Sequence, residues 1–226
     1  MAPLRLGLSM PLRHMSDLSP ANWFCGDIDR TSLWLGPSGY EAYIRVLHQD
    51  NDGDRWEGHL DDHLLLALCQ VLARHTKTPD TCYFGLWEGY GDITGGEAVG
   101  FLTAFSGSAR WPRVFRPEKK PVPPPPAFGP EIVNGPKVDF FHQYLLFTGR
   151  LDDAGQWGAR PYGPGIPRHI NSPNLMWPAD HAWFVTTNIE GHWTGVGGSD
   201  TLADELLADD RLDTVRTRYD DPHRDL

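Results

Sequence analysis

Two histidines stand four residues apart in the segment HLDDH, at the start of an apolar, helix-like stretch. His59 and His63 would lie on one face of a helix, where they could bind zinc with Asp62 or a distant histidine as third ligand. The segment lacks the glutamate that serves as general base in the HExxH pattern. A surface pair at a helix start is the simpler interpretation, so His59 and His63 stay minor metal candidates and no cofactor is expected.

Carboxylates occur at two places where they could act as acid and base. Glu88 and Asp92 lie in the glycine-rich loop EGYGDITGG, directly after an apolar segment, and the end of a strand is a frequent position for a site. Asp180 precedes His181, but neighbouring residues of a strand point to opposite faces and would not form a dyad. We therefore expect Asp180 to accept hydrogen bonds from backbone amides where the chain enters a strand.

The sequence offers no established nucleophile or phosphate-binding motif. It contains no GxSxG pattern, and the glycines at 85, 89 and 91 do not fit GxGxxG. Cys25 has Asp27 and Asp29 as neighbours, and their negative charge would raise the pKa of the thiol, the wrong direction for a nucleophile. The three cysteines are odd in number and lack CxxC spacing, so neither a disulfide framework nor a cysteine zinc site is indicated.

Composition restricts the class of protein further. The chain has 226 residues, a formal net charge of −10, 12% aromatic residues and nine tryptophans. An acidic chain is poorly suited to nucleic-acid phosphates, whereas an acidic surface keeps a protein soluble or attracts a basic partner. The N-terminal segment has two early prolines and no continuous apolar run, and no stretch of about 20 apolar residues follows. We expect a cytoplasmic protein that binds neither nucleic acid nor membrane.

Hydrophobic periodicity predicts helices and strands in alternation with long loops. Leucines and valines recur at three- and four-residue steps over residues 59–75, which predicts an amphipathic helix. Short apolar or alternating runs predict strands, and Ser199 or Asp200 is positioned to cap a short second helix. The expected strands cover residues 40–48, 82–87, 140–148, 182–189 and 192–196, and the second helix covers 201–208.

The segment from 174 to 199 contains the clearest hairpin pattern. Trp183, Val185 and Thr187 alternate with polar or aromatic residues. Glu190 and Gly191 predict a two-residue turn, with glycine at a position where a positive φ is tolerated. Gly197 and Gly198 then predict the end of the second strand.

This order of elements predicts an α+β fold, a single domain with a mainly antiparallel sheet and helices packed on one face. Residues 1–20 are interpreted as a loose arm, 21–213 as the domain and 214–226 as an acidic frayed tail. The proline-rich stretch 106–138 is interpreted as a long surface loop, with a ligand for a proline-recognising groove as the alternative.

Several segments together resemble a family of uncharacterised actinobacterial proteins. They are YEAYIRVLH (40–48), LCQVLARHTKTPDTCYFGLWEGYG (68–91), YLLFTG (144–149) and NLMWPADHAWFVTTNIEGHWTGVGGS (174–199). The resemblance implies a whole related domain but supplies no catalytic residues. In size, hairpin and acidic balance the chain is also similar, by analogy, to immunity proteins of the SMI1/KNR4 type.

We therefore expect a protein-binding module of a regulatory or immunity type rather than an enzyme. Tryptophan and tyrosine are favoured as anchors of exposed interfaces. The alternative is a small-molecule-binding protein or hydrolase, with a pocket between residues 88–96 and 174–181 and Glu88, Asp92 and Asp180 as its polar groups. A structural role in a larger assembly, with the proline-rich stretch as its arm, is a third possibility. The candidate binding residues are Trp87, Glu88, Tyr90, Asp92, Trp177, Asp180 and Trp193.

Overall fold

A computed structural model describes residues 11–26, 30–48, 57–94 and 125–220 of the chain. Its contacts divide the chain into two compact units. The first consists of Met1–Trp87, Pro136–Gly158 and Asn171–Leu226, and the second of Glu88–Gly135 and Ala159–Ile170. Most of the proline-rich stretch 106–138, up to residue 124, lies outside the described residues, as do the first ten residues of the expected arm and residues 221–226 of the expected tail.

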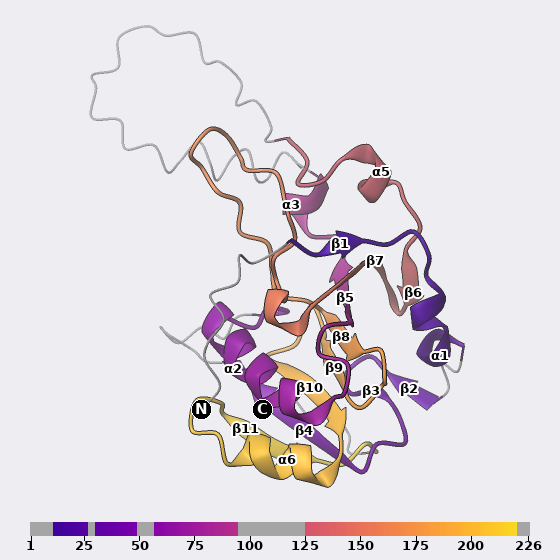
Figure 1. The fold of residues 1–226 in the computed structure, drawn as a ribbon, viewed down its shortest axis with the longest axis vertical. Coiled ribbons are helices and arrows are strands. Elements are labelled where there is room, and N and C mark those ends of the chain that lie inside the picture. The colour runs from indigo at the N-terminus through magenta and orange to yellow at the C-terminus, as the bar shows by residue number, and fades with distance from the viewer. Residues whose placement is uncertain (1–10, 27–29, 49–56, 95–124, 221–226) are drawn as a thin grey trace, which may run out of the picture. The chain divides into compact units, whose positions relative to one another are not determined.

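The first unit is built on a sheet in which every described strand pair is antiparallel (Figure 1). The predicted α+β fold with a mainly antiparallel sheet is therefore confirmed. The strands lie in the order β1 (Arg13–His14), β7 (His142–Gly149), β5 (Cys82–Trp87), β8 (Leu175–Pro178), β9 (Phe184–Thr187), β10 (Trp193–Gly198), β4 (Ala42–Leu47) and β11 (Thr214–Thr217), and β6 (Val138–Phe140) pairs with β7. A separate two-stranded sheet joins β2 (Thr31–Ser32) to β3 (Gly36–Pro37).

Two helices, α2 (Asp62–Leu72) and α6 (Asp200–Leu207), contact each other and cover one face of the sheet (Figure 1). The apolar stripe of α2 is buried, as its three- and four-residue spacing requires. Ser199 caps α6 as predicted, because its hydroxyl accepts a hydrogen bond from the amide of Leu202 at 3.2 Å.

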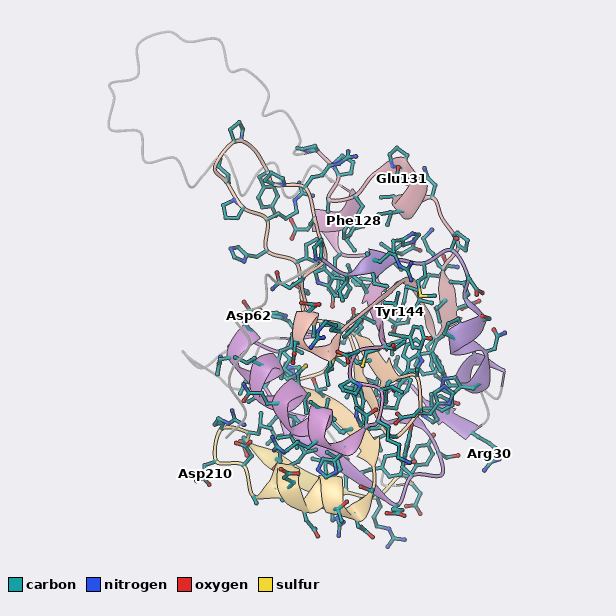
Figure 2. The ribbon with its side chains drawn as sticks, viewed as in Figure 1. Arg30, Asp62, Phe128, Glu131, Tyr144 and Asp210 are labelled. Atoms are coloured by element: carbon teal, nitrogen blue, oxygen red, sulfur yellow. The ribbon has the colours of Figure 1, made fainter. Side chains whose placement is uncertain are left out.

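The opposite face of the sheet is covered by the N-terminal part of the chain. This part contains the 3-10 turn η1 (Ser19–Ala21), the short helix α1 (Asn22–Cys25) and the strands β2 and β3. Phe24 of α1 is 1% exposed and has edge contacts with Trp177 and Phe184 of the sheet, both at ring-centroid distances of 5.0 Å. Tyr144, labelled in Figure 2, is fully buried in the same aromatic cluster. Aromatic side chains thus form the core on this face, because each buries a large apolar area.

The segment that contains Trp34 lies so close to β10 that β10 needs a glycine at the point of contact. A Cβ atom at Gly195 of β10 would lie 2.2 Å from the carbonyl oxygen of Trp34, a distance that backbone cannot accommodate. Gly191 has a related role, since its Cβ would lie 2.9 Å from the ring of Trp34. Gly191 is not among the residues with positive φ, so the predicted reason for its presence was wrong. It admits an aromatic ring instead of permitting a left-handed turn.

Some predicted boundaries differ from the structure. The helix begins at Asp62 rather than at residue 59, and β10 continues through Gly197 and Gly198. Residues 214–217, expected in a frayed tail, form β11, which pairs with β4. Residues 13 and 14, expected in a loose arm, form β1, which pairs with β7.

The second unit contains two short helices, α3 (Gly91–Thr94) and α5 (Pro130–Val133). Backbone hydrogen bonds join its segments, from Ala127 to Ile93 at 3.1 Å and from Arg160 to Ala127 at 2.8 Å. Phe128, labelled in Figure 2 together with Glu131 of α5, is 3% exposed and supplies apolar core to this unit.

Replacing Phe24 tests whether the aromatic cluster stabilises the first unit. We expect Phe24→Ala to lower the free energy of unfolding by about 3–5 kcal/mol, because a large buried ring is lost and a cavity remains. Urea denaturation measures the change. Phe141→Ala is the matched control, since Phe141 is 50% exposed. A similar loss in both variants would contradict the assignment of Phe24 to the core.

Candidate functional site

Two of the tryptophans proposed as binding residues are buried. Trp177 is 0% exposed and Trp193 is 5% exposed. Trp177 stacks between Tyr83 and Phe184, with centroid distances of 5.5 and 5.8 Å. The expectation that Trp177 and Trp193 form an exposed interface is therefore wrong for the described conformation, because their rings fill the core on the side of the sheet that faces α1.

Trp193 has a further structural role at the end of β10. Its ring stacks on Trp34 at a centroid distance of 5.3 Å, and the guanidinium of Arg45 lies 4.7 Å from its centroid. Arg45 is only 7% exposed, so the cation–π contact offsets part of the cost of removing its charge from water. Trp87, at the end of β5, is half-buried, and its ring lies 6.1 Å from that of His142.

Asp180 stabilises the turn that leads into β9. Its carboxylate accepts hydrogen bonds from the hydroxyl of Thr76 at 2.8 Å, from the amide of Lys77 at 2.7 Å and from the amide of Ala182 at 3.3 Å. Partial burial acts to raise the pKa of Asp180, but these hydrogen bonds outweigh it and lower the pKa. The predicted hydrogen bonds to backbone amides are confirmed, and this carboxylate is engaged by its own chain.

The two histidines do not form a pair on a helix. His59 precedes α2, and its Nδ1 accepts a hydrogen bond from the amide of Ser172 at 3.0 Å. His63 lies in the first turn of α2 and is exposed. Across residues 11–26, 30–48, 57–94 and 125–220, no group of three or more His, Cys, Asp or Glu side chains could hold a metal ion. The spacing argument fails because the helix begins after His59.

The remaining candidates, Glu88, Tyr90 and Asp92, belong to the second unit. Asp92 accepts a hydrogen bond from the hydroxyl of Tyr162. Burial is the largest cause that raises the pKa of Tyr162 to about 12, followed by this bond to Asp92. Glu88 and Tyr90 are half-buried.

Arg168 joins the segments around Asp92. Its guanidinium donates to the carbonyl oxygens of Asp92 and Pro125 and lies 4.4 Å from the ring centroid of Tyr162. The contacts of Arg168, Tyr162 and Asp92 connect parts of the unit that are distant in sequence. They identify this cluster as a structural element of the second unit.

The cysteines are poorly suited to nucleophilic catalysis. Burial, and then the charge of Asp139, raises the pKa of Cys25 to about 11. Burial likewise raises the pKa of Cys82 to about 12. The direction expected for Cys25 is thus confirmed, with burial as the largest cause and Asp139 as the second; Asp27 and Asp29 lie outside the described residues.

Some of the polar groups that line a shallow groove on the first unit are already paired with other groups of the protein. Arg216 pairs with Asp200 at 2.5 Å, so two of its charged groups already neutralise each other. The hydroxyl of Tyr219 donates to the carbonyl oxygens of Arg30 and Gly36. The groove is lined by Glu41, Ala42, Tyr43, Asp200, Arg216, Thr217, Arg218, Tyr219 and Asp220.

Two exposed aromatic residues, Phe141 and His181, were not indicated by the sequence. Among the described non-glycine residues, Phe141 and His181 alone have a positive φ, at 58° and 54°, a conformation that bulky side chains rarely adopt. Phe141 stands between the paired residues Phe140 and His142 and is 50% exposed. His181 is also exposed. Their backbone conformation depends on pairing and turn geometry, which no motif in the sequence marked.

Ring contacts connect these two residues through α1. His181 stacks on Trp23 at a centroid distance of 4.2 Å, and its carbonyl accepts a hydrogen bond from the hydroxyl of Tyr40 at 3.2 Å. Phe141 lies 4.9 Å from Phe140, and Phe140 lies 5.3 Å from Phe24, the neighbour of Trp23 in α1. We give the name aromatic surface to the exposed residues Phe141 and His181 together with Trp23 and Tyr40, which are half-buried and contact His181.

Comparisons with protein-family models, with curated proteins and with solved structures find no match. The resemblance to actinobacterial proteins therefore stays a prediction. None of the helices in the described parts of the chain has the length and apolar character needed to cross a membrane.

Replacing Asp180 tests its role in the turn. Because the folded-state pKa is below the ordinary value of 3.8, the carboxylate contributes stability above that pH and loses it as pH falls further. We expect Asp180→Asn to cost about 1 kcal/mol at pH 7, the difference between charged and neutral acceptors. The gap from wild type narrows below about pH 4, as measured by urea denaturation over a pH series. Asp210→Asn, at an exposed position labelled in Figure 2, is the control; a gap independent of pH would disprove the charged role.

Replacing Arg168 tests the cluster of the second unit. Lysine cannot reproduce a planar fork that contacts two carbonyls and an aromatic ring. We expect Arg168→Lys to speed hydrogen exchange at the amides of Ala127 and Arg160 about tenfold. Amides of β5 and β7 keep their protection. Arg160→Lys, at an exposed position, is the control, and unchanged exchange in Arg168→Lys would contradict this role.

Proposed function

We propose that the protein is a cytoplasmic protein-binding module, of a regulatory or immunity type, that contacts its partner through the aromatic surface. The observation that carries the proposal is the pair of exposed aromatic residues in the left-handed conformation. Holding a non-glycine residue there costs about 1–3 kcal/mol. Phe141 bears this cost while its side chain stays 50% exposed, and a strained backbone at an exposed aromatic residue is the reason for proposing a role in contact with another molecule.

The packing beneath the surface gives the proposal further support. The stack on Trp23 orients the ring of His181, and the hydrogen bond from Tyr40 holds its backbone carbonyl, so both are positioned before any partner arrives. Phe141 follows buried Phe140, which anchors the turn from which it projects. Rigid aromatic side chains lose little conformational entropy on binding, and this favours them as anchors.

The alternative of a small-molecule hydrolase has less support. Asp92 and Asp180 each accept hydrogen bonds from neighbouring protein groups within their own units. The Cys25 and Cys82 thiols have raised pKa values that keep them protonated at neutral pH. A binding function uses the surface without requiring either group to react.

Affinity capture with a matched pair of variants tests the proposal. Phe141→Asn removes the anchor while asparagine tolerates the left-handed conformation. Leu207→Asn is the matched control. It removes another large apolar side chain of similar exposure, since Leu207 on α6 is 43% exposed. We expect wild type and Leu207→Asn to retain the same partner from native cytoplasm. Retention by Phe141→Asn falls about thirtyfold, as for loss of a hot-spot residue of about 2 kcal/mol.

Thermal unfolding of all three proteins confirms that each is folded at the capture temperature. Equal recovery of every bound protein by wild type and Phe141→Asn would exclude the aromatic surface as the interface. Failure of wild type to retain any protein above the background of the matrix would count against a protein-binding function.

A further inference from the structure

Arg45 of β4 carries a positive charge that is largely removed from water and has no anionic partner. The residue is only 7% exposed, and its guanidinium lies 4.7 Å from the ring centroid of Trp193 on β10. Across residues 11–26, 30–48, 57–94 and 125–220, this guanidinium forms no ion pair with a carboxylate. Its Nε atom is enclosed and has no hydrogen-bond partner among the described residues. The charge persists all the same, because a guanidinium does not lose its proton in proteins.

The ring of Trp193 compensates only part of the free energy that burial of this charge requires. Removing an ion from water costs more than a single cation–π contact returns. Val215 of β11 lies opposite Arg45 in the sheet. Asp213, two residues before Val215, is exposed but forms no ion pair with Arg45 in the part of the chain that the structure describes. The packing around Arg45 therefore leaves a cation without a counter-charge.

The outer end of the Arg45 side chain is open to solvent. Nη1 and Nη2 form no hydrogen bond with any described residue, and unlike Nε they are not enclosed. β11 is the last strand of the sheet, and Val215 on this strand is 41% exposed. Residues directly opposite each other in an antiparallel pair share one face, with Cβ atoms about 5 Å apart. An exposed apolar side chain thus lies beside the open end of the guanidinium.

We infer that Arg45 binds the carboxylate of a small organic acid whose apolar part rests on Val215. Nη1 and Nη2 present two donors in one plane, which match the two oxygens of a carboxylate. The contact with Trp193 orients these donors before the ligand arrives, so little conformational entropy is lost on binding. Arg216, the basic residue of β11, is already paired with Asp200. The site thus offers a single free cation, which favours a monovalent carboxylate over a doubly charged phosphate.

This site shares no residue with the aromatic surface. It adds a small-molecule site to the proposed function and does not depend on that function. The two proposals can therefore fail separately.

Titration of the full chain with sodium benzoate tests the inference, with nitrogen–proton correlation spectra of the arginine side chains as the readout. The Arg45→Met variant identifies the Nε–Hε signal of Arg45 by its loss. We expect benzoate to shift this signal with a dissociation constant on the order of 1 mM, a usual affinity for a ligand of this size. Benzamide has the same shape without the charge and should leave the signal in place, as should sodium chloride at equal ionic strength.

Four variants locate the site through the shifts that benzoate causes at the amides of β4 and β11. Arg45→Met removes the unpaired charge but keeps an apolar stem, so the protein stays folded and benzoate binding is lost. Arg45→Lys keeps the charge without the planar donors and should bind about tenfold more weakly. Val215→Ala reduces the apolar contact and should bind about threefold more weakly. Arg218→Met is the matched control, because the Arg218 side chain is 84% exposed, and it should bind as wild type does. Unchanged amide signals of β5 and β7 show that each variant is folded.

Several outcomes would overturn the inference. An Arg45 signal that does not respond to benzoate, or that responds equally to benzamide or sodium chloride, would show that no carboxylate binds there. Binding that survives Arg45→Met, or that falls equally in Arg218→Met, would place the benzoate elsewhere. Tighter binding of inorganic phosphate than of benzoate would disprove the assignment to a monovalent carboxylate. Each of these results leaves the test of the aromatic surface by affinity capture unaffected.

Discussion

The close contact between residues 34–36 and the strands β9 and β10 is the constraint on which the first unit depends. One face of the sheet is packed by α2 and α6, but the other is covered by irregular chain, which must lie almost directly on the backbone of β10. Gly195 makes this possible, because any side chain there would collide with the carbonyl of Trp34. Once this segment lies flat, Leu35 is fully buried and Trp34 can stack on Trp193. Polar backbone and aromatic rings are thereby packed together without a long helix on that face.

Asn174 explains why the chain approaches the hairpin as it does. Its side-chain oxygen accepts a hydrogen bond from the amide of Trp87 at 2.9 Å, and its side-chain nitrogen donates to the carbonyl of Thr187 at 3.3 Å. Its backbone bonds to Gly85 and Thr187 as well. This fully buried amide therefore joins β5 to β9 just before β8 begins, where a missing hydrogen bond would be costly. Asn174 therefore helps to hold the sheet together just before the hairpin.

The same packing produces the exposed aromatic surface. Covering the sheet with α1 brings Trp23 beside the turn that ends at His181, and the tight connection between β6 and β7 projects Phe141 outward. Neither residue could be recognised from its neighbours in sequence, because a left-handed φ at a bulky residue is imposed by surrounding contacts. The tryptophans that stand out in the sequence are mostly required for the core. The binding residues that we propose are instead ones that the packing leaves exposed, such as Phe141 and His181.

By itself the sequence determined the α+β class, the apolar stripe of α2, the Ser199 cap and the register of the β9–β10 hairpin. A turn centred on Glu190 and Gly191 places Thr187 opposite Thr194, as observed. The hydrogen-bonded turn itself lies one residue earlier than predicted, because the amide of Gly191 donates to the carbonyl of Asn188. Only the tertiary structure decided that His59 lies outside the helix, that Asp180 bonds to the loop at Thr76 and Lys77, and that Trp177 is buried. Local patterns fix periodicity and turns, which depend on neighbours in the chain. Burial and hydrogen-bond partners depend on contacts between segments about a hundred residues apart, such as Lys77 and Asp180. A local sequence pattern cannot predict such contacts.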